Sequence, residues 1–323
     1  MAGGAFAYLS LRQPDMAPAS TRQVDRSPER IARGKYLFEK VSNCAHCHSV
    51  QDETLFGMPP KPGTIGGGAE FPKAMEFPGR VVASNLTSDP ETGAGRWSDG
   101  QLIRAIREGI GHDDRALFPM MPYSEFKAMS DPDVESVVAY IRTLAPIRNS
   151  LPRTEIDFPV NLLMKSAPQP LAAPVPHPDR SNPVAYGGYL VRISGCEFCH
   201  TPVDDHHAPI VDKKFAGGQV FFTGPGIRAV SANITPDPDT GIGTLDEAQF
   251  LDKFDQYREY IEKGSKAVPA ANNTQMPWLS FAGMERDDLK AIYAFLRTVK
   301  PVKNDVVTHP DAPESKLPAG AKP

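Results

Sequence analysis

The chain has 323 residues and a formal net charge of −4, which is too small to indicate nucleic acid as a partner. Its length predicts about two domains, at roughly 100 to 200 residues each. Proline accounts for 33 residues, about twice ordinary usage, which favours irregular, turn-rich segments over long helices or a large sheet.

The N-terminus begins with a short apolar run over residues 2–9. This run is far shorter than the ~20 residues that span a bilayer, and it lacks the charged start and cleavage site of a complete signal peptide. Two interpretations of residues 1–26 stay open: a truncated membrane anchor or signal, or a disordered tail. We find no other apolar run long enough to cross a membrane.

The first half of the chain alternates helix signals with loops. Ser27-Pro28 predicts a helix that leads into the first cysteine motif, with Ser as N-cap and Pro at the first helical position. Residues 50–98 are rich in Gly and Pro and predict a long ordered loop with at most a short hairpin. Residues 99–109 predict a helix, 118–129 a loop, and 130–144 a second helix with an apolar face.

The middle of the chain predicts a linker. Residues 147–183 carry eight prolines, so we expect no helix or central strand there, but an extended, semi-rigid segment along the surfaces of both domains. The predicted organisation is a first domain at 27–148, a Pro-rich linker at 149–182, a second domain at 183–302 and a C-terminal tail at 303–323.

All four cysteines lie in two copies of one pentapeptide. Cys44-Ala45-His46-Cys47-His48 recurs as Cys196-Glu197-Phe198-Cys199-His200. C-x-x-C-H is the attachment signature of c-type haem, because two thiols one helical turn apart add to the two vinyl groups of one porphyrin and the next residue, His, becomes the proximal iron ligand.

Other uses of these cysteines are less well supported. A single C-x-x-C also suits a redox dithiol or half of a zinc site, but zinc needs clustered ligands that the remaining histidines do not offer. A disulfide framework is unusual for four cysteines in a chain of this length. We therefore predict two covalently attached haem c groups, bound by Cys44, Cys47, Cys196 and Cys199, with His48 and His200 as iron ligands. In bacteria haem is attached to such motifs outside the cytoplasm, so the resemblance to c-type cytochromes implies a periplasmic or outward-facing protein.

An internal repeat connects the two motifs. The haem cysteines are offset by 152 residues, Asn85-Leu86-Thr87 and Asn233-Ile234-Thr235 by 148, and Met121-Pro122 and Met276-Pro277 by 155. A nearly constant offset over some 110 residues predicts two homologous domains.

The repeat also predicts the second axial ligand of each iron. Met121 and Met276 occupy equivalent places, each followed by Pro and an aromatic residue, and a thioether is a suitable soft donor that raises the reduction potential. Met120 competes with Met121, but Gln275 stands at its place in the second copy. His206 and His207 compete with Met276, because they follow the second motif closely; the alternative is that they are solvated loop residues.

Two further equivalent pairs are candidates for the haem propionates. Arg80 and Arg228 stand five residues before Asn85 and Asn233, and buried carboxylates need positive charge and hydrogen-bond donors. We predict that these Arg and Asn residues hold propionates. The alternative is that the Asn-x-Thr segments only form turns.

Taken together, two C-x-x-C-H motifs, two distal Met-Pro-aromatic segments and two closing amphipathic helices resemble a tandem class I cytochrome c. The Asn-x-Thr-x-Asp-Pro-x-Thr-Gly stretches resemble the cytochrome c subunits of bacterial membrane-bound alcohol and gluconate dehydrogenases. The resemblance implies a mainly α fold: two tandem class I cytochrome c domains with long irregular loops, in which an N-terminal helix is crossed by a C-terminal helix. Gly34 would then face Tyr140, and Gly187 or Gly188 would face Phe295. Those subunits usually carry three haem motifs, whereas this chain has two.

The expected function is electron transfer rather than catalysis by the chain itself. With both axial positions filled, no substrate binds iron, and the chain passes electrons from a dehydrogenase to a cytochrome or oxidase of a respiratory chain. The partners are therefore redox proteins and no nucleic acid, with membrane anchoring through the N-terminus if that segment is an anchor. The alternatives are a dihaem peroxidase-like enzyme and a haem-based sensor, each of which needs an open haem face.

Overall fold

The computed structural model describes residues 10–205 and 208–313. The apolar run at residues 2–9, His206 and His207 lie outside the described residues. No helix in the described part of the chain is both long and apolar enough to cross a membrane. The chain divides into two compact units: unit 1 comprises Met1–Phe38, Cys47–Val50 and Pro62–His177, and unit 2 comprises Glu39–His46, Gln51–Lys61 and Pro178–Pro323.

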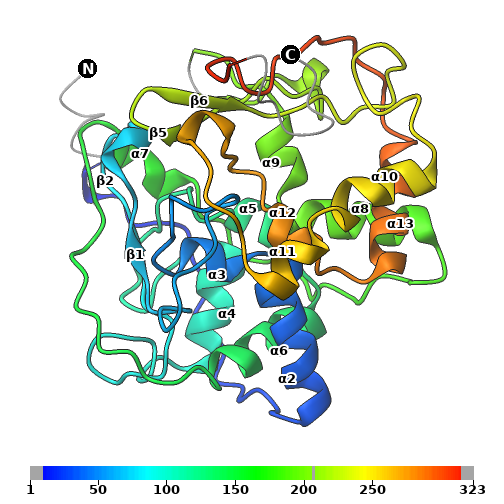
Figure 1. Cartoon of the computed structure of the whole chain (residues 1–323). Helices are drawn as coiled ribbons and strands as arrows, with labels where there is room; N and C mark the ends of the chain where they lie inside the picture. The colour runs from blue at the N-terminus through cyan, green and yellow to red at the C-terminus, as the bar shows by residue number, and fades with distance from the viewer. Residues whose placement is uncertain (1–9, 206–207, 314–323) are drawn as a thin grey trace, which may run out of the picture. The chain divides into compact units, whose positions relative to one another are not determined.

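Short helices and two-residue strands make up unit 1 (Figure 1). The chain passes between the units within a π-helical turn and within the helix of the first cysteine motif, η1 (Leu37–Val41) and α3 (Cys44–Cys47). The other elements of unit 1 are α2 (Pro28–Tyr36), β1 (Ala69–Glu70), η2 (Lys73–Met75), β2 (Gly79–Arg80), β3 (Val82–Ala83), α4 (Asp99–Glu108), α5 (Tyr123–Phe126), α6 (Asp131–Ile141), β4 (Glu155–Ile156), α7 (Val160–Leu163) and η3 (Met164–Ser166). Strands β1 and β3 pair antiparallel, as do β2 and β4.

Unit 2 repeats the helical order with one longer hairpin. Its elements are α8 (Pro183–Ile193), α9 (Cys196–His200), η4 (Val211–Lys213), β5 (Val220–Gly224), β6 (Ile227–Val230), α10 (Glu247–Asp255), α11 (Arg258–Lys263), η5 (Ala270–Asn272), α12 (Trp278–Phe281) and α13 (Arg286–Leu296). Strands β5 and β6 pair antiparallel with a bulge between Phe222 and Gly224. The described parts of the chain are thus mostly helical with a little sheet.

A close helix crossing organises unit 1. Helix α2 packs on α6 (Figure 1), and a Cβ atom at Gly34 would lie 1.8 Å from the carbonyl oxygen of Ser136 and 2.9 Å from Cβ of Tyr140. Only a residue without a side chain permits this approach. Next to the crossing, the Phe38 and Tyr140 rings meet edge to face at 5.3 Å. The predicted meeting of Gly34 and Tyr140 is confirmed.

The same crossing recurs in unit 2 between α8 and α13. A Cβ atom at Gly187 would lie 1.8 Å from the carbonyl oxygen of Ala291 and 3.0 Å from Cβ of Phe295. At Gly188, a Cβ atom would lie 2.9 Å from the Phe295 ring. Both glycines therefore face Phe295, as predicted.

The helix starts follow their capping residues. Ser27 and Ser130 cap α2 and α6, each accepting a hydrogen bond from the backbone N–H three residues on, and Gly109 ends α4 with φ 72°. Two predictions of the absence of helix were wrong. Within 118–129 the chain forms α5, and within 147–183 it forms the single turn α7, which lies outside the dense proline cluster at 168–178. Strand β4 also lies in 147–183, but it pairs only with β2 and is no central strand.

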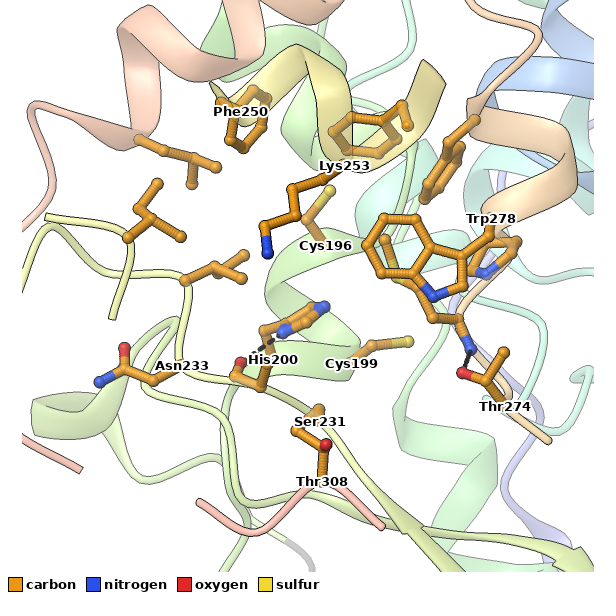
Figure 2. Close-up of a pocket in the computed structure, with 18 of the residues that line it drawn as sticks. Cys196, Cys199, His200, Ser231, Asn233, Phe250, Lys253, Thr274, Trp278 and Thr308 are labelled. Atoms are coloured by element: carbon orange, nitrogen blue, oxygen red, sulfur yellow. Dashed lines mark hydrogen bonds between the residues drawn. The ribbon is translucent and has the colours of Figure 1, made fainter. Parts of the chain in front are cut away.

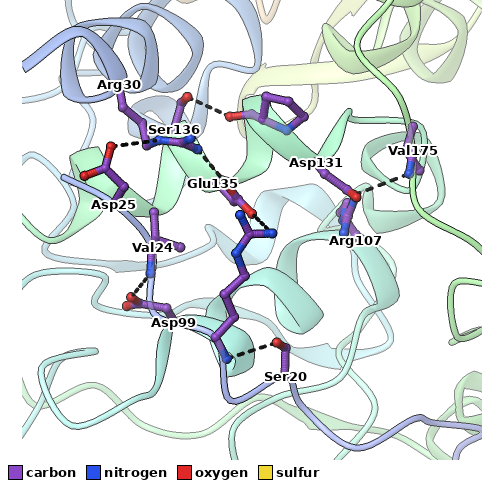
Figure 3. Close-up of polar contacts among 12 residues, drawn as sticks. Ser20, Val24, Asp25, Arg30, Asp99, Arg107, Asp131, Glu135, Ser136 and Val175 are labelled. Carbon is purple, nitrogen blue, oxygen red and sulfur yellow. Dashed lines mark hydrogen bonds and ion pairs between the residues drawn. The ribbon is translucent and has the colours of Figure 1, made fainter. Parts of the chain in front are cut away.

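A hydrogen bond and an ion pair hold the segment that precedes α2 against the helices of unit 1 (Figure 3). The backbone N–H of Val24 donates to Asp99 at 2.9 Å. The carboxylate of Glu135, on α6, pairs with Arg22 at 2.9 Å and with Arg30 at 2.6 Å. Residues 20–25, within the segment predicted as a tail, therefore have a defined place in unit 1.

The proline-rich stretch up to His177 lies in unit 1, and unit 2 begins again at Pro178. Asp131 at the start of α6 holds Val175 through two hydrogen bonds: the Asp131 N–H donates to the Val175 carbonyl at 2.9 Å, and the Val175 N–H donates to the Asp131 carboxylate at 3.4 Å (Figure 3). The boundaries of this proline-rich stretch as a linker between tandem domains, 149–182, remain a prediction.

A buried asparagine accounts for the presence of residues 51–61 in unit 2. The Asn273 side chain is fully buried; its amide nitrogen donates to the Leu55 carbonyl at 3.0 Å, and its amide oxygen accepts from the Gly57 N–H at 2.9 Å. Between these contacts, the Phe56 ring stacks on Tyr257 at 5.1 Å. One side chain thus satisfies backbone groups on both sides of Phe56.

The helix crossings generate a stability prediction. Gly34→Ala in unit 1 and Gly187→Ala in unit 2 place a methyl group inside the van der Waals radius of a backbone carbonyl, so each is expected to destabilise its unit by about 3 kcal/mol, at the upper end of overpacking costs. Thermal unfolding followed by circular dichroism measures the loss. Gly63→Ala is the control, because its Cβ would meet nothing within 4 Å and its φ of 77° costs only about 1 to 2 kcal/mol. Equal losses in all three variants would refute the close crossing.

Candidate haem sites

Each C-x-x-C-H histidine is held by a backbone carbonyl. Nδ1 of His48 lies 2.7 Å from the carbonyl oxygen of Ser84, and Nδ1 of His200 lies 2.7 Å from that of Ala232. A carbonyl oxygen only accepts, so Nδ1 carries the proton and the Nε2 lone pair is left for a metal. Burial lowers the pKa of both imidazoles, which keeps them neutral as ligation requires.

The Asn-x-Thr segments fix these acceptor carbonyls, because each begins one residue after the carbonyl. In unit 2 the Asn233 amide nitrogen donates to the Thr240 hydroxyl at 3.0 Å and to the Val302 carbonyl at 2.8 Å. Its amide oxygen accepts from the Thr235 N–H at 3.0 Å and from the Thr235 hydroxyl at 2.8 Å. Both the nitrogen and the oxygen of this buried amide therefore form hydrogen bonds that hold the loop.

The same network recurs in unit 1. The Asn85 amide nitrogen donates to Thr92 at 3.3 Å and to the Ile147 carbonyl at 2.7 Å, and its amide oxygen accepts twice from Thr87. The turn-forming interpretation of these asparagines thus describes their contacts in both units. Their predicted role toward propionates remains a prediction.

A glycine in each unit ties the histidine backbone to the same loop. The N–H of Gly68 donates to the carbonyl of His48, and the N–H of Gly217 donates to that of His200, each at 2.8 Å. Both glycines have left-handed backbones, with φ 79° and 70°, and a Cβ on either would lie within 2.7 Å of backbone atoms. Only glycine fits these two positions.

A cavity of about 420 Å³ lies beside the second motif in unit 2 (Figure 2). This volume falls in the roughly 300 to 1,000 Å³ range of small-molecule and cofactor sites. Several residues that the sequence predicts to bind haem line this cavity: Cys196, Cys199, His200, Asn233 and Met276. Four candidate haem-binding side chains, separated by up to 80 positions in the sequence, are thereby brought together with Asn233.

The remainder of the cavity lining is mainly apolar and aromatic, including Phe250, Phe254, Trp278 and Leu289. The Ser194 hydroxyl is buried at this cavity without a hydrogen-bond partner among the described residues. Sequence reasoning did not select these residues, although the aromatic spacing of α10 was a signal for an apolar face.

All four cysteines are partly exposed as residues, but the thiols of Cys47 and Cys196 are desolvated. Desolvation raises the pKa of Cys47 to about 11 and that of Cys196 to about 12, so both carry their protons at neutral pH. A protonated thiol is what adds across a vinyl group to form a thioether, with its hydrogen passing to the neighbouring carbon. These thiols therefore carry the hydrogen that such an addition needs.

Met121 and Met276 occupy identical turns. Pro122 has φ −79° and ψ 53°, and Pro277 has φ −79° and ψ 56°. In each turn the methionine carbonyl accepts a hydrogen bond from the N–H two residues on, at 2.7 Å and 2.8 Å, which closes an inverse γ-turn. Their sequence equivalence is thus matched by local geometry.

A second methionine pair has the same offset. Met129 and Met284 each follow the short helix after the Met-Pro turn, 155 residues apart, and both are buried. Met284 also lines the cavity in unit 2. Sequence reasoning missed this pair, although the offset alone could have found it. What distinguishes Met276 is its stiff turn.

Both predicted propionate arginines are engaged elsewhere. The Arg228 guanidinium forms hydrogen bonds to Asp311 at 2.7 Å and 3.1 Å, and it does not line the cavity described beside the second motif. This contact lowers the pKa of Asp311 to about 2. The Arg80 guanidinium lies 3.4 Å from Glu70 and 3.5 Å from Glu155. Their role toward propionates stays a prediction without a supporting contact.

The residues present in unit 2 fit a covalently attached haem. Two thiols at C-x-x-C spacing, an imidazole with its Nε2 directed by a fixed tautomer, a thioether and an apolar cavity make up the required donor set and surroundings. In unit 1 the histidine, its carbonyl, the asparagine loop and the Met-Pro turn repeat the same geometry.

Comparisons with known proteins agree with this assignment. The family model for cytochrome c matches residues 31–145. The chain is 32% identical over 253 residues, 72% of its length, to a nicotinate dehydrogenase subunit of Pseudomonas putida, of which it covers 20%. It is 27% identical over 294 residues, 86% of its length, to the cytochrome c subunit of a quinone-linked alcohol dehydrogenase of Gluconacetobacter polyoxogenes, of which it covers 58%.

A third relative has nearly the same length. The chain is 27% identical over 299 residues to a diheme c-type cytochrome of Cereibacter sphaeroides, covering 88% of itself and 93% of the relative. By contrast, it spans a fifth of the nicotinate dehydrogenase subunit and just over half of the alcohol dehydrogenase subunit. Residues 31–145 thus belong to the cytochrome c family, and the chain resembles the cytochrome c subunits of bacterial dehydrogenases.

Proposed function

We propose that the chain is a dihaem c-type cytochrome that transfers electrons from a dehydrogenase to a respiratory acceptor, a cytochrome or an oxidase, in the periplasm. In this proposal two tandem cytochrome c domains, at 27–148 and 183–302, each hold one haem c. The haem iron supplies a one-electron couple when bound. The chain itself binds no substrate for chemistry and is an electron-transfer protein or subunit.

The cavity in unit 2 carries this proposal. His200 and Met276 line one apolar space together with both cysteines, so the chain offers both a nitrogen and a sulfur donor to one metal. Two protein ligands leave no coordination position for a substrate, as in cytochromes with His and Met ligation. We propose that His48 and Met121 play the same roles in unit 1.

The protein groups around the donors set the properties of such a site. The carbonyls of Ser84 and Ala232 fix the imidazole tautomer and raise the basicity of Nε2. Neutral thioether ligands and a largely apolar lining both disfavour extra positive charge on iron. They therefore favour the reduced state and a raised potential.

The relatives support a dehydrogenase as electron donor. Their names describe cytochrome subunits of alcohol, fructose and gluconate dehydrogenases. The relative of nearly equal length is named as diheme, which supports two haems in this chain. A peroxidase-like function requires one displaceable ligand, and the matching Met-Pro turns favour two filled sites instead.

Exchanging one donor at a time tests the ligand assignment. Met276→His and Met121→His each replace a soft thioether with a more basic nitrogen, so each is expected to lower one midpoint potential and leave the other in place. A spectroelectrochemical titration of the full holoprotein measures both potentials.

The chain supplies matched controls. Met284→Leu and Met129→Leu remove the other repeat-equivalent methionines, which are also buried, and are expected to leave both potentials nearly unchanged. A loss of the sulfur-to-iron charge-transfer band in Met284→Leu, with Met276→Leu unaffected, would assign the ligand to Met284 and contradict the proposal.

The asparagine loops generate a second prediction. Asn85→Ala and Asn233→Ala each leave buried loop groups without partners, at a cost of about 1 to 3 kcal/mol in the stability of the unit concerned. Thermal unfolding of the holoprotein measures this loss, with the exposed Asn161→Ala as control. If neither variant loses stability, the asparagines do not hold the acceptor carbonyls. A shift of one midpoint potential in addition to the stability loss would show that the loop acts on the iron ligand of that unit.

A further inference from the structure

The cavity in unit 2 contains one charged side chain that the electron-transfer proposal does not use. Lys253 lies on α10, and Figure 2 shows its ammonium group extending from this helix into the cavity, toward the side where His200 lies. No hydrogen bond or ion pair joins this ammonium to the described residues.

The charge of Lys253 has no counterpart in the lining. Among the described residues that line the cavity, Lys253 has the single ammonium or guanidinium group, and none is an aspartate or a glutamate. The helix offers no neutralising partner either, since the positions three and four residues away are Gln249, Phe250, Gln256 and Tyr257. A cation directed into a mainly apolar space without an anion is costly, so the occupant is expected to bring the negative charge.

The position of Lys253 on its helix is set by the apolar face. Phe250 and Phe254 are buried, at 6% and 7% exposure, and both line the cavity. Lys253 is three residues after Phe250, so it shares the face that meets the cavity. The capping box of Asp246 and Gln249 fixes where this helix begins and thereby which face is turned inward.

Unit 1 lacks this charge. Its helix α4 has the same capping box, formed by Ser98 and Gln101, 148 residues earlier. The residue equivalent to Lys253 is therefore Ala105, which is buried. The nearby arginines Arg104 and Arg107 are each paired with an aspartate. The repeat thus differs in charge at one position of the equivalent helices.

We propose that Lys253 binds a carboxylate of the cofactor, a haem propionate, and raises the reduction potential of the haem in unit 2. This inference rests on the proposed function. The ammonium neutralises the carboxylate, which would otherwise be buried beside apolar groups. A positive charge near the iron also disfavours the ferric state, which carries one more positive charge than the ferrous state. Since Ala105 supplies no such charge, this effect acts on one centre only.

Charge removal in the full holoprotein tests this role. Lys253→Met and Lys253→Gln remove the ammonium while keeping an unbranched stem, and each is expected to lower one midpoint potential. The affected centre must be the one that Met276→His shifts. Lys253→Arg keeps the charge and is expected to retain most of the wild-type potential. Lys263→Met, on helix α11, removes the same net charge away from the cavity and is expected to move neither potential.

Three results would overturn the inference. If Lys253→Met and Lys253→Gln shift neither potential, or shift only the centre affected by Met121→His, Lys253 holds no carboxylate of the second haem. Equal shifts of the midpoint potential in Lys253→Met and Lys263→Met would show that only the net charge of the protein matters, not the position of Lys253. A change of iron spin state in both charge-removing variants would make Lys253 an iron ligand. Failure of the proposed function gives a different result: wild-type protein with fewer than two haems, or without sulfur ligation.

Discussion

The hydrogen bond between each C-x-x-C-H histidine and a backbone carbonyl is the constraint on which both sites depend. A C-x-x-C-H helix places two thiols and an imidazole next to one another, but it does not decide which ring nitrogen is free. The carbonyls of Ser84 and Ala232 decide it, because they can only accept. Everything that holds those carbonyls, above all the buried Asn85 and Asn233, therefore acts on the proposed iron ligand.

The chemical groups of the sites follow from the sequence, while their supports do not. C-x-x-C-H spacing, helix caps at Ser27 and Ser130, and the glycine at each helix crossing are local patterns with a direct physical reason. Any residue can supply a backbone carbonyl as acceptor, so the identity of Ala232 does not indicate its role. No local pattern indicates the partner of Arg228, since Asp311 is 83 residues away and binds the guanidinium.

Tertiary contacts also place one segment differently from what its position in the sequence predicts. Residues 51–61 follow the first motif directly, and their position in the sequence therefore predicts that they belong to the first domain. The structure groups them with unit 2, where the buried Asn273 binds the backbone of Leu55 and Gly57, and the boundaries of the first domain at 27–148 stay a prediction. A polar residue that is buried through bonds to a remote segment has no periodicity to reveal it. Conversely, the offset of Met129 and Met284 can be read from the sequence and equals that of Met121 and Met276. Only the Met-Pro turn distinguishes Met121 and Met276 from the other pair.

The two units share their donors but differ in charge. Repeat-equivalent histidines and methionines suit two centres of the same kind, which is what a relay of electrons needs. Lys253 in place of Ala105 introduces an electrostatic difference between them without a change of ligand. Under the proposed function, two similar centres with unequal potentials favour electron flow in one direction.

The central claim is that both irons have two protein ligands. Its most direct test is the spin state of the oxidised full-length holoprotein, measured by electron paramagnetic resonance before and after addition of cyanide, together with haem content per chain. The account predicts two haems, both low-spin, with slow or negligible cyanide binding. A high-spin haem that binds cyanide rapidly would contradict the account and favour an enzyme with one open haem site.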